Sequence, residues 1–328
     1  MKKLYPLKFE DSCNQEAVVT NGFLAENSLD DIVDTYLGNI LGDKVFRAFR
    51  GLFPIAVEIC DILKQSHLEP INLCPNNEIA EQRYGCQGKE IMLYVLEAEE
   101  NAELYIGFKR SLTATDIYNL CQEGRIIDAM NDIAPQQGEI FYIRPGVPFC
   151  LGRGAKYLKV EQNSPVLFNI DNLEELVESL DFIELGKYIP EYAAPEESLL
   201  RVERIAISKP QTIFPDQGES FMVIIGLQGR VSIKTSDVYG VKENNAENYQ
   251  EVGKEEVLLI PQQINQAELT PIEGQAEFLR VYVNLPEEEP FEIESNDDDC
   301  HCDEHGHHHH NCNCGEDNHH HGNEENCN

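Results

Sequence analysis

The residues best suited to metal chemistry are gathered near the C-terminus of the chain. Nine of its ten histidines and five of its eleven cysteines lie between Cys300 and Cys327. The candidate ligands are Cys300, His301, Cys302, His305, His307, His308, His309, His310, Cys312, Cys314, His319, His320, His321 and Cys327. Thiolates and imidazoles suit zinc, nickel and copper(I), and the interleaved acidic residues attract any cation. The pattern predicts bound transition metal, with zinc first and nickel or copper as alternatives.

The spacing of these ligands does not define one tetrahedral site. Cys-x-Cys pairs and runs of histidine offer overlapping ligand sets, so we expect several ions bound with graded affinity. A purification tag would contain neither cysteine nor acidic residues, so this segment is not interpreted as a tag. Beyond Ile293 the chain has no apolar residue other than cysteine. Such a segment cannot bury enough surface to fold alone, so residues 286–328 are predicted to be a disordered, acidic metal-binding tail.

Composition limits the partners of the whole chain. A net charge of −34 over 328 residues argues against nucleic acid and against an anionic membrane surface. We find neither a signal peptide nor an apolar run long enough to span a bilayer, so the expected compartment is the cytoplasm. Thiols stay reduced there, and the six cysteines outside the tail are interpreted as small buried hydrophobes.

Capping boxes and apolar periodicity predict three helices before residue 181. Ser28 and Asp31 form a box ahead of a helix over Leu29–Leu41, which Gly42 should close. Thr113 and Asp116 form a second box, and a third helix is expected over Leu173–Leu180.

Short apolar runs separated by turn residues predict a mainly β protein. In the first half these runs are Phe53–Ile62, Ile91–Ala98, Leu104–Phe108 and Ile140–Ile143. In the second half they are Leu200–Ile207, Ser220–Leu227, Arg230–Thr235, Val257–Ile260 and Phe278–Asn284. Their length and spacing favour an antiparallel sandwich or barrel, with a jelly roll as the first choice.

Several segments resemble, in order and spacing, the small bacterial class of type I mannose-6-phosphate isomerases, which are zinc-dependent cupins. The matching segments are Val18–Ala25, Phe53–Ile55, Asn72–Glu78, Gly88–Tyr94, Gly138–Gly154 and Glu161–Ser164. The resemblance implies a cupin domain with helical insertions over residues 1–198 and a second cupin-like β domain over residues 199–285, ahead of the tail at 286–328.

The resemblance also implies where a metal site should lie. The family's ligands are Gln, His, Glu and His, and these positions are occupied by Asn72, Cys74, Ile91 and Phe149. Isoleucine and phenylalanine have no lone pair to offer a metal. The family's catalytic arginine falls on Asn169.

Two residues next to these positions have charged side chains. Lys89 matches the family's lysine. Glu90 could replace the missing glutamate only if its strand slipped by one residue, which would turn every neighbour to the opposite face.

These observations are compatible with three functions. The first is a non-catalytic cupin that binds metal through its tail and acts as a metal buffer, a donor to a metal-receiving protein or a metal-responsive protein. The second is an active isomerase, interconverting mannose 6-phosphate and fructose 6-phosphate, with a displaced site built from Cys74, Glu90 and Glu161. The third is a regulator that binds a sugar phosphate without converting it.

Overall fold

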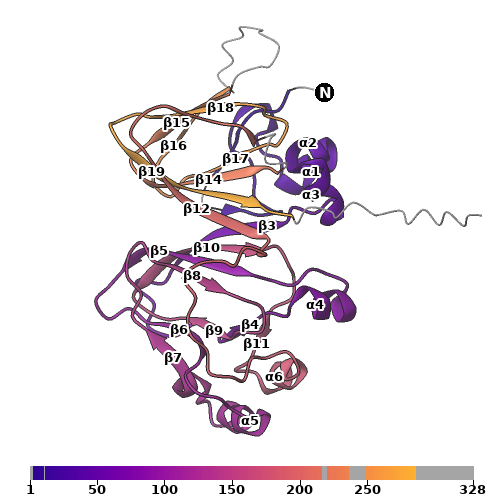
Figure 1. Ribbon diagram of the computed structural model, residues 1–328, viewed down its shortest axis with the longest axis vertical. Coiled ribbons are helices and arrows are strands. Elements are labelled where there is room, and N and C mark those ends of the chain that lie inside the picture. Colours follow the sequence, from indigo (N-terminus) through magenta and orange to yellow (C-terminus); the bar gives the residue numbers. More distant parts are fainter. Residues whose placement is uncertain (1–2, 11, 216–219, 236–247, 286–328) are drawn as a thin grey trace, which may run out of the picture. The chain divides into compact units, whose positions relative to one another are not determined.

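The computed structural model describes residues 3–10, 12–215, 220–235 and 248–285, which belong to a single unit of the chain, Met1–Pro286 (Figure 1). The candidate metal ligands from Cys300 to Cys327, and the predicted disorder of residues 286–328, lie outside the described residues. The predicted division at residues 198 and 199 stays a prediction. Within the described ranges, every helix is too short or too polar to cross a membrane.

The first half of the unit contains two five-stranded antiparallel sheets. One has the order β2 (Ser12–Cys13), β3 (Ile55–Asp61), β10 (Ala155–Gln162), β5 (Ile91–Ala98), β8 (Ile140–Ile143). The other has the order β11 (Phe168–Asn169), β4 (Asn72–Leu73), β9 (Phe149–Leu151), β6 (Leu104–Phe108), β7 (Met130–Ile133). Side chains from both sheets meet in one apolar cluster that includes Leu93, Ile106 and Tyr157, which we call the barrel interior.

A second pair of sheets follows the same plan. Its larger sheet has the order β1 (Leu7–Phe9), β17 (Val257–Ile260), β14 (Met222–Gln228), β19 (Ala276–Val283), β12 (Leu200–Ile207). Its smaller sheet has the order β13 (Gln211–Ile213), β18 (Ala267–Pro271), β15 (Val231–Thr235), β16 (Tyr249–Val252). The mainly β, cupin-like architecture predicted from the sequence is confirmed.

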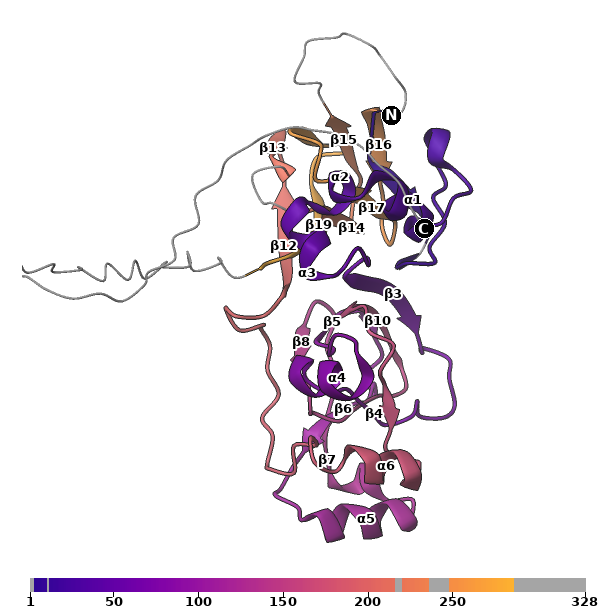
Figure 2. The same cartoon turned by 90° about the vertical axis from the view of Figure 1, so that its right-hand side faces the viewer.

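One apolar cluster joins the two halves of this unit. Met92, Leu158 and Val160, on the outer faces of β5 and β10, belong to the same cluster as Val223 and Val281 of β14 and β19. Helices α1 (Leu29–Tyr36), α2 (Gly38–Leu41) and α3 (Asp43–Ala48) contribute to it as well and lie beside β14 and β17 (Figures 1 and 2).

The first predicted helix is confirmed at its start and wrong in its length. The Ser28 hydroxyl accepts a hydrogen bond from the Asp31 backbone N–H at 3.2 Å, as the capping box requires. The helix ends at Tyr36, because Leu37 takes a φ of +52° and turns the chain. A separate short helix, α2, then runs to Leu41. Apolar spacing continued across this break, so periodicity alone did not reveal it.

Two of the remaining helices cover the second sheet of the first half. In α5 (Ala114–Gln122) both arms of the Thr113 and Asp116 capping box are formed, and α6 (Leu173–Ser179) occupies the third predicted position. The sequence did not predict α4 (Asn77–Tyr84), nor the short 3-10 helices η1 (Gly22–Leu24) and η2 (Ile126–Ala129). Side chains of α5, η2 and α6 pack in one apolar cluster with β4 and β9. Figure 2 shows the ribbons of α5 and α6 next to each other.

Candidate functional site

The structure brings together the four positions at which the resemblance implies metal ligands. Asn72 on β4 pairs with Phe149 on β9 and with Asn169 on β11. Cys74 follows β4, and its side chain belongs to the barrel interior together with those of Ile91 and Phe149. The positions therefore converge on one end of the barrel interior, which we call the vestigial pocket.

The residues in the vestigial pocket do not fit a zinc ion. Ile91 and Phe149 are 1% and 3% exposed and pack as core side chains without any donor atom. Burial raises the pKa of the Cys74 thiol to about 12, so the thiolate that a metal needs is strongly disfavoured. Across the part of the chain that the structure describes, no three His, Cys, Asp or Glu side chains are grouped to hold a metal.

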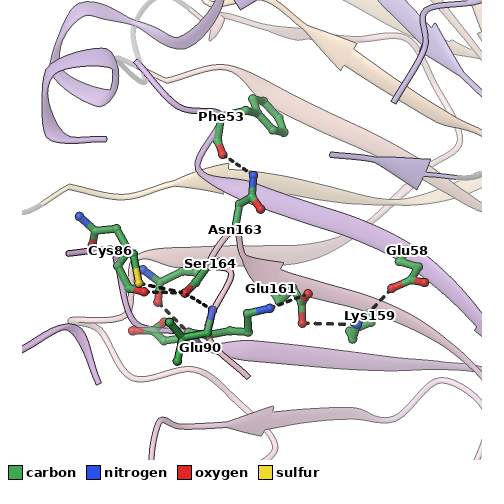
Figure 3. Close-up of polar contacts among 12 residues, drawn as sticks. Phe53, Glu58, Cys86, Glu90, Lys159, Glu161, Asn163 and Ser164 are labelled. Carbon is green, nitrogen blue, oxygen red and sulfur yellow. Dashed lines mark hydrogen bonds and ion pairs between the residues drawn. The ribbon is translucent and has the colours of Figure 1, made fainter. Parts of the chain in front are cut away.

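Charged side chains lie beside this pocket and neutralise one another. The Glu161 carboxylate accepts from the Lys89 ammonium at 3.1 Å and lies 3.4 Å from the Lys159 ammonium. Lys159 in turn lies 3.1 Å from Glu58. Figure 3 shows the Lys159 ammonium between the carboxylates of Glu161 and Glu58. We call Lys89, Glu161 and Lys159 the ion-pair chain.

Strand register places the ion-pair chain on the inner face of its sheet. Glu161 is opposite Ile91 and Lys159 is opposite Leu93 in the β10–β5 pair, and directly opposed residues point to the same face. Burial pulls the pKa of Lys159 down, but Glu161 and other nearby negative groups outweigh it and hold that pKa above its ordinary value. Lys159 therefore stays a cation despite its partial burial.

Glu90 does not join this group. Its carboxylate accepts from the Ser198 hydroxyl, and its backbone N–H donates to the Gln162 side chain at 3.0 Å. It also acts on the pKa of Tyr142, a residue of the other apolar cluster. Among the three residues considered for a displaced site, Cys74 and Glu161 lie near each other, while Glu90 is on the opposite face.

A cleft borders the position of the family's arginine. This cleft of about 460 Å³ is lined by Asn169 and by ten further residues from four segments of the first half. His67, Glu69 and Asp171 provide titratable groups, and its lining includes no lysine or arginine. The Asn169 side-chain oxygen accepts from the Asp171 N–H at 3.0 Å, which fixes the amide. A phosphate group would meet carboxylates here without a compensating cation.

Sequence reasoning missed Lys159 and Glu58 as neighbours of the pocket. The available signal was the alternation in Leu158–Glu161, where the apolar Leu158 and Val160 alternate with the charged Lys159 and Glu161. Such a pattern usually places charges in water. Here both faces of β10 are covered, and the charged face is the one turned toward the barrel interior.

The sequence relatives found among known proteins are named as mannose-6-phosphate isomerases. No protein-family profile matches the chain. The mannose-6-phosphate isomerase ManA of Bacillus subtilis is 22% identical over 161 residues, 48% of this chain and 47% of the relative. The mannose-6-phosphate isomerase of Streptococcus mutans is 22% identical over 193 residues, 56% of this chain and 58% of the relative. The match thus spans about half the length of these curated relatives.

Solved structures extend the likeness to most of the fold. The mannose 6-phosphate isomerase of Bacillus subtilis superposes with a TM-score of 0.61 at 16% identity, covering 82% of this chain and 85% of that one. A variant of the phosphomannose isomerase from Salmonella typhimurium gives 0.64 at 12% identity, covering 86% and 91%. In sequence the chain is similar to mannose-6-phosphate isomerases, and its fold is the cupin fold of the phosphomannose isomerases.

Proposed function

We propose that the chain is a non-catalytic, phosphomannose-isomerase-like cupin that binds transition metal through residues 286–328. It would act as a metal buffer, a metal donor or a metal-responsive protein. The observation that supports this proposal is the packing of Ile91 and Phe149, 1% and 3% exposed, at two positions where the resemblance implies glutamate and histidine ligands. The composition of residues 300–327 supports the metal-binding half.

The chemistry of the pocket supports the loss of catalysis. Aldose–ketose isomerisation needs an electrophile that polarises the carbonyl and a positioned group that moves protons. Lys89 is 7% exposed and engaged by Glu161, so it is not free to approach a substrate. The position of the arginine holds Asn169, whose neutral amide stabilises a developing anion less well than a guanidinium.

An active isomerase is the second candidate, because the sequence relatives have that name. We expect purified full-length protein, supplied with zinc and mannose 6-phosphate, to show no fructose 6-phosphate above background in a coupled assay. The Bacillus subtilis isomerase serves as the positive control. Turnover of even about one per second, low for an ordinary enzyme, would overturn the non-catalytic proposal.

Binding without turnover separates the third candidate from the first. Calorimetric titration of the same preparation with mannose 6-phosphate should give no heat of binding if the protein acts only on metals. A saturable signal without isomerisation would instead identify a sugar-phosphate-binding regulator.

The tail ligands should discriminate between metals. Replacement of Cys300, Cys302, Cys312 and Cys314 by serine should weaken zinc and copper(I) binding more than nickel binding, because nickel can still use the imidazoles of His307–His310. Competition with a chromophoric chelator measures each affinity. Equal losses for all three metals would show that the cysteines act together with the histidines in every site.

A further inference from the structure

The ion-pair chain stands beside the position where the resemblance implies a metal-binding glutamate. Glu161 is the direct cross-strand partner of Ile91, so its carboxylate leaves the same face of the sheet one strand away. Lys89 lies two residues before Ile91, and Lys159 faces Leu93. All three charged groups belong to the rim of the vestigial pocket.

These charges are removed from water to an unusual degree. The side chains of Lys89 and Glu161 are 8% and 13% exposed, and that of Lys159 is 19% exposed. An isolated charge at such a depth is strongly unfavourable, and it persists only where a partner of opposite sign is close. The ammonium groups of Lys89 and Lys159 lie 3.1 Å and 3.4 Å from the Glu161 carboxylate, and within the described residues these two lysines are the ion-pair partners of Glu161.

The three side chains also connect neighbouring strands of the sheet through their ion pairs. Lys159 and Glu161 belong to β10, the central strand between β3 and β5. Lys159 reaches Glu58 on β3, and Glu161 reaches Lys89, which directly precedes Glu90 and the start of β5. The Lys89 backbone N–H donates to the Pro75 carbonyl at 3.3 Å, which connects the chain to the segment of Cys74. A metal ion performs the same kind of cross-linking between strands.

The charges also balance without a metal ion. The two ammonium groups of Lys89 and Lys159 face the two carboxylates of Glu161 and Glu58. We propose that the ion-pair chain of Lys89, Glu161 and Lys159 replaces a metal ion as the centre that holds this end of the barrel, so that the cupin is structurally independent of metal. This rests on the part of the proposed function that places no metal in the barrel.

Thermal unfolding of the full-length chain in the presence of EDTA tests the proposal. Glu161→Gln leaves the buried Lys89 ammonium facing a neutral amide and leaves Lys159 with only the more exposed Glu58, so it should lower Tm by about 5 °C or more. EDTA itself should leave the Tm of the unsubstituted chain unchanged. The matched control is Glu81→Gln, which breaks the Arg50–Glu81 ion pair with side chains 74% and 67% exposed. It should shift Tm by no more than about 1 °C.

Two further variants keep the test decisive if Glu161→Gln does not fold. Lys89→Met removes one cation and leaves Glu161 with Lys159, so its Tm should fall less. Combining Lys89→Met, Lys159→Met and Glu161→Leu removes the three buried charges and leaves only Glu58, whose side chain is 55% exposed, so it should recover most of the lost stability.

An unchanged Tm for Glu161→Gln would overturn the proposal while leaving the proposed function intact. A fall in Tm on adding EDTA to the unsubstituted chain, equal to that caused by Glu161→Gln, would show that a metal holds the barrel. Isomerase turnover, by contrast, would overturn the proposed function whatever the Tm values are.

Discussion

Removing every residue after Leu285 is expected to reduce the bound zinc or nickel from several ions per chain to fewer than one. Leu285 packs against the shared apolar cluster and is kept for that reason. The removed segment contains all fourteen candidate ligands, whereas the described residues group no three metal-binding side chains. Metal analysis after gel filtration measures the load. Because cysteine must lose its proton and histidine must be neutral, the full-length load should also fall between about pH 7.5 and pH 5.5.

The control for this truncation keeps the length and acidity of the tail. Every cysteine of residues 300–327 is replaced by serine and every histidine by asparagine. This variant should bind as little metal as the truncated chain, which would assign the metal to the ligands rather than to the negative charge. If the truncated chain kept the full load, the metal would lie in the cupin, and Ile91 and Phe149 could not represent a dismantled site.

Restoring a ligand to the pocket is expected to unfold the protein rather than to create a metal site. Ile91→Glu would place an unpaired carboxylate at a position that is 1% exposed, directly across from Glu161. Burial without a partner and repulsion by Glu161 should together lower the free energy of unfolding by about 4 kcal/mol or more. Urea denaturation followed by circular dichroism measures the loss.

The matched control for Ile91→Glu removes a methyl group without adding charge. Ile91→Val should lower the free energy of unfolding by about 0.5–1.5 kcal/mol, the usual effect of a small cavity. If zinc restored the stability of Ile91→Glu to that of the unsubstituted chain, the pocket would still hold enough ligands for a metal. The conclusion that the pocket residues do not fit a zinc ion would then be wrong.

Local signals in the sequence predicted those elements whose boundaries are chemically marked. The Thr113 capping box predicted the start of α5, and the apolar run Ile91–Ala98 predicted both ends of β5. Strand β10 was not predicted, because its alternation is interrupted by a bulge between Lys156 and Tyr157 and includes charged residues on an inward face. Periodicity identifies which residues share a face, and it does not say what covers that face.

The candidate site shows the same limit. Residue types alone established that Ile91 and Phe149 cannot bind a metal, since this needs no coordinates. Where Glu90 and Glu161 point depends on strand register, which pairs Glu161 with Ile91 across residues 70 positions apart in the chain. Glu69 and Asp171 meet in one cleft only because β4 and β11 are neighbours, and no local pattern connects them.

The pairing of β1 with β17 has a consequence for how the protein is made. Leu7 is opposite Leu259, so the first strand to be synthesised waits for a partner that follows 252 residues later. At roughly 5–20 residues per second, that interval is about 13–50 s on the ribosome. During it the apolar faces of α1–α3 lack the β14 and β17 side chains that cover them in the finished fold. We expect the nascent chain, more than the mature protein, to depend on chaperones for its survival.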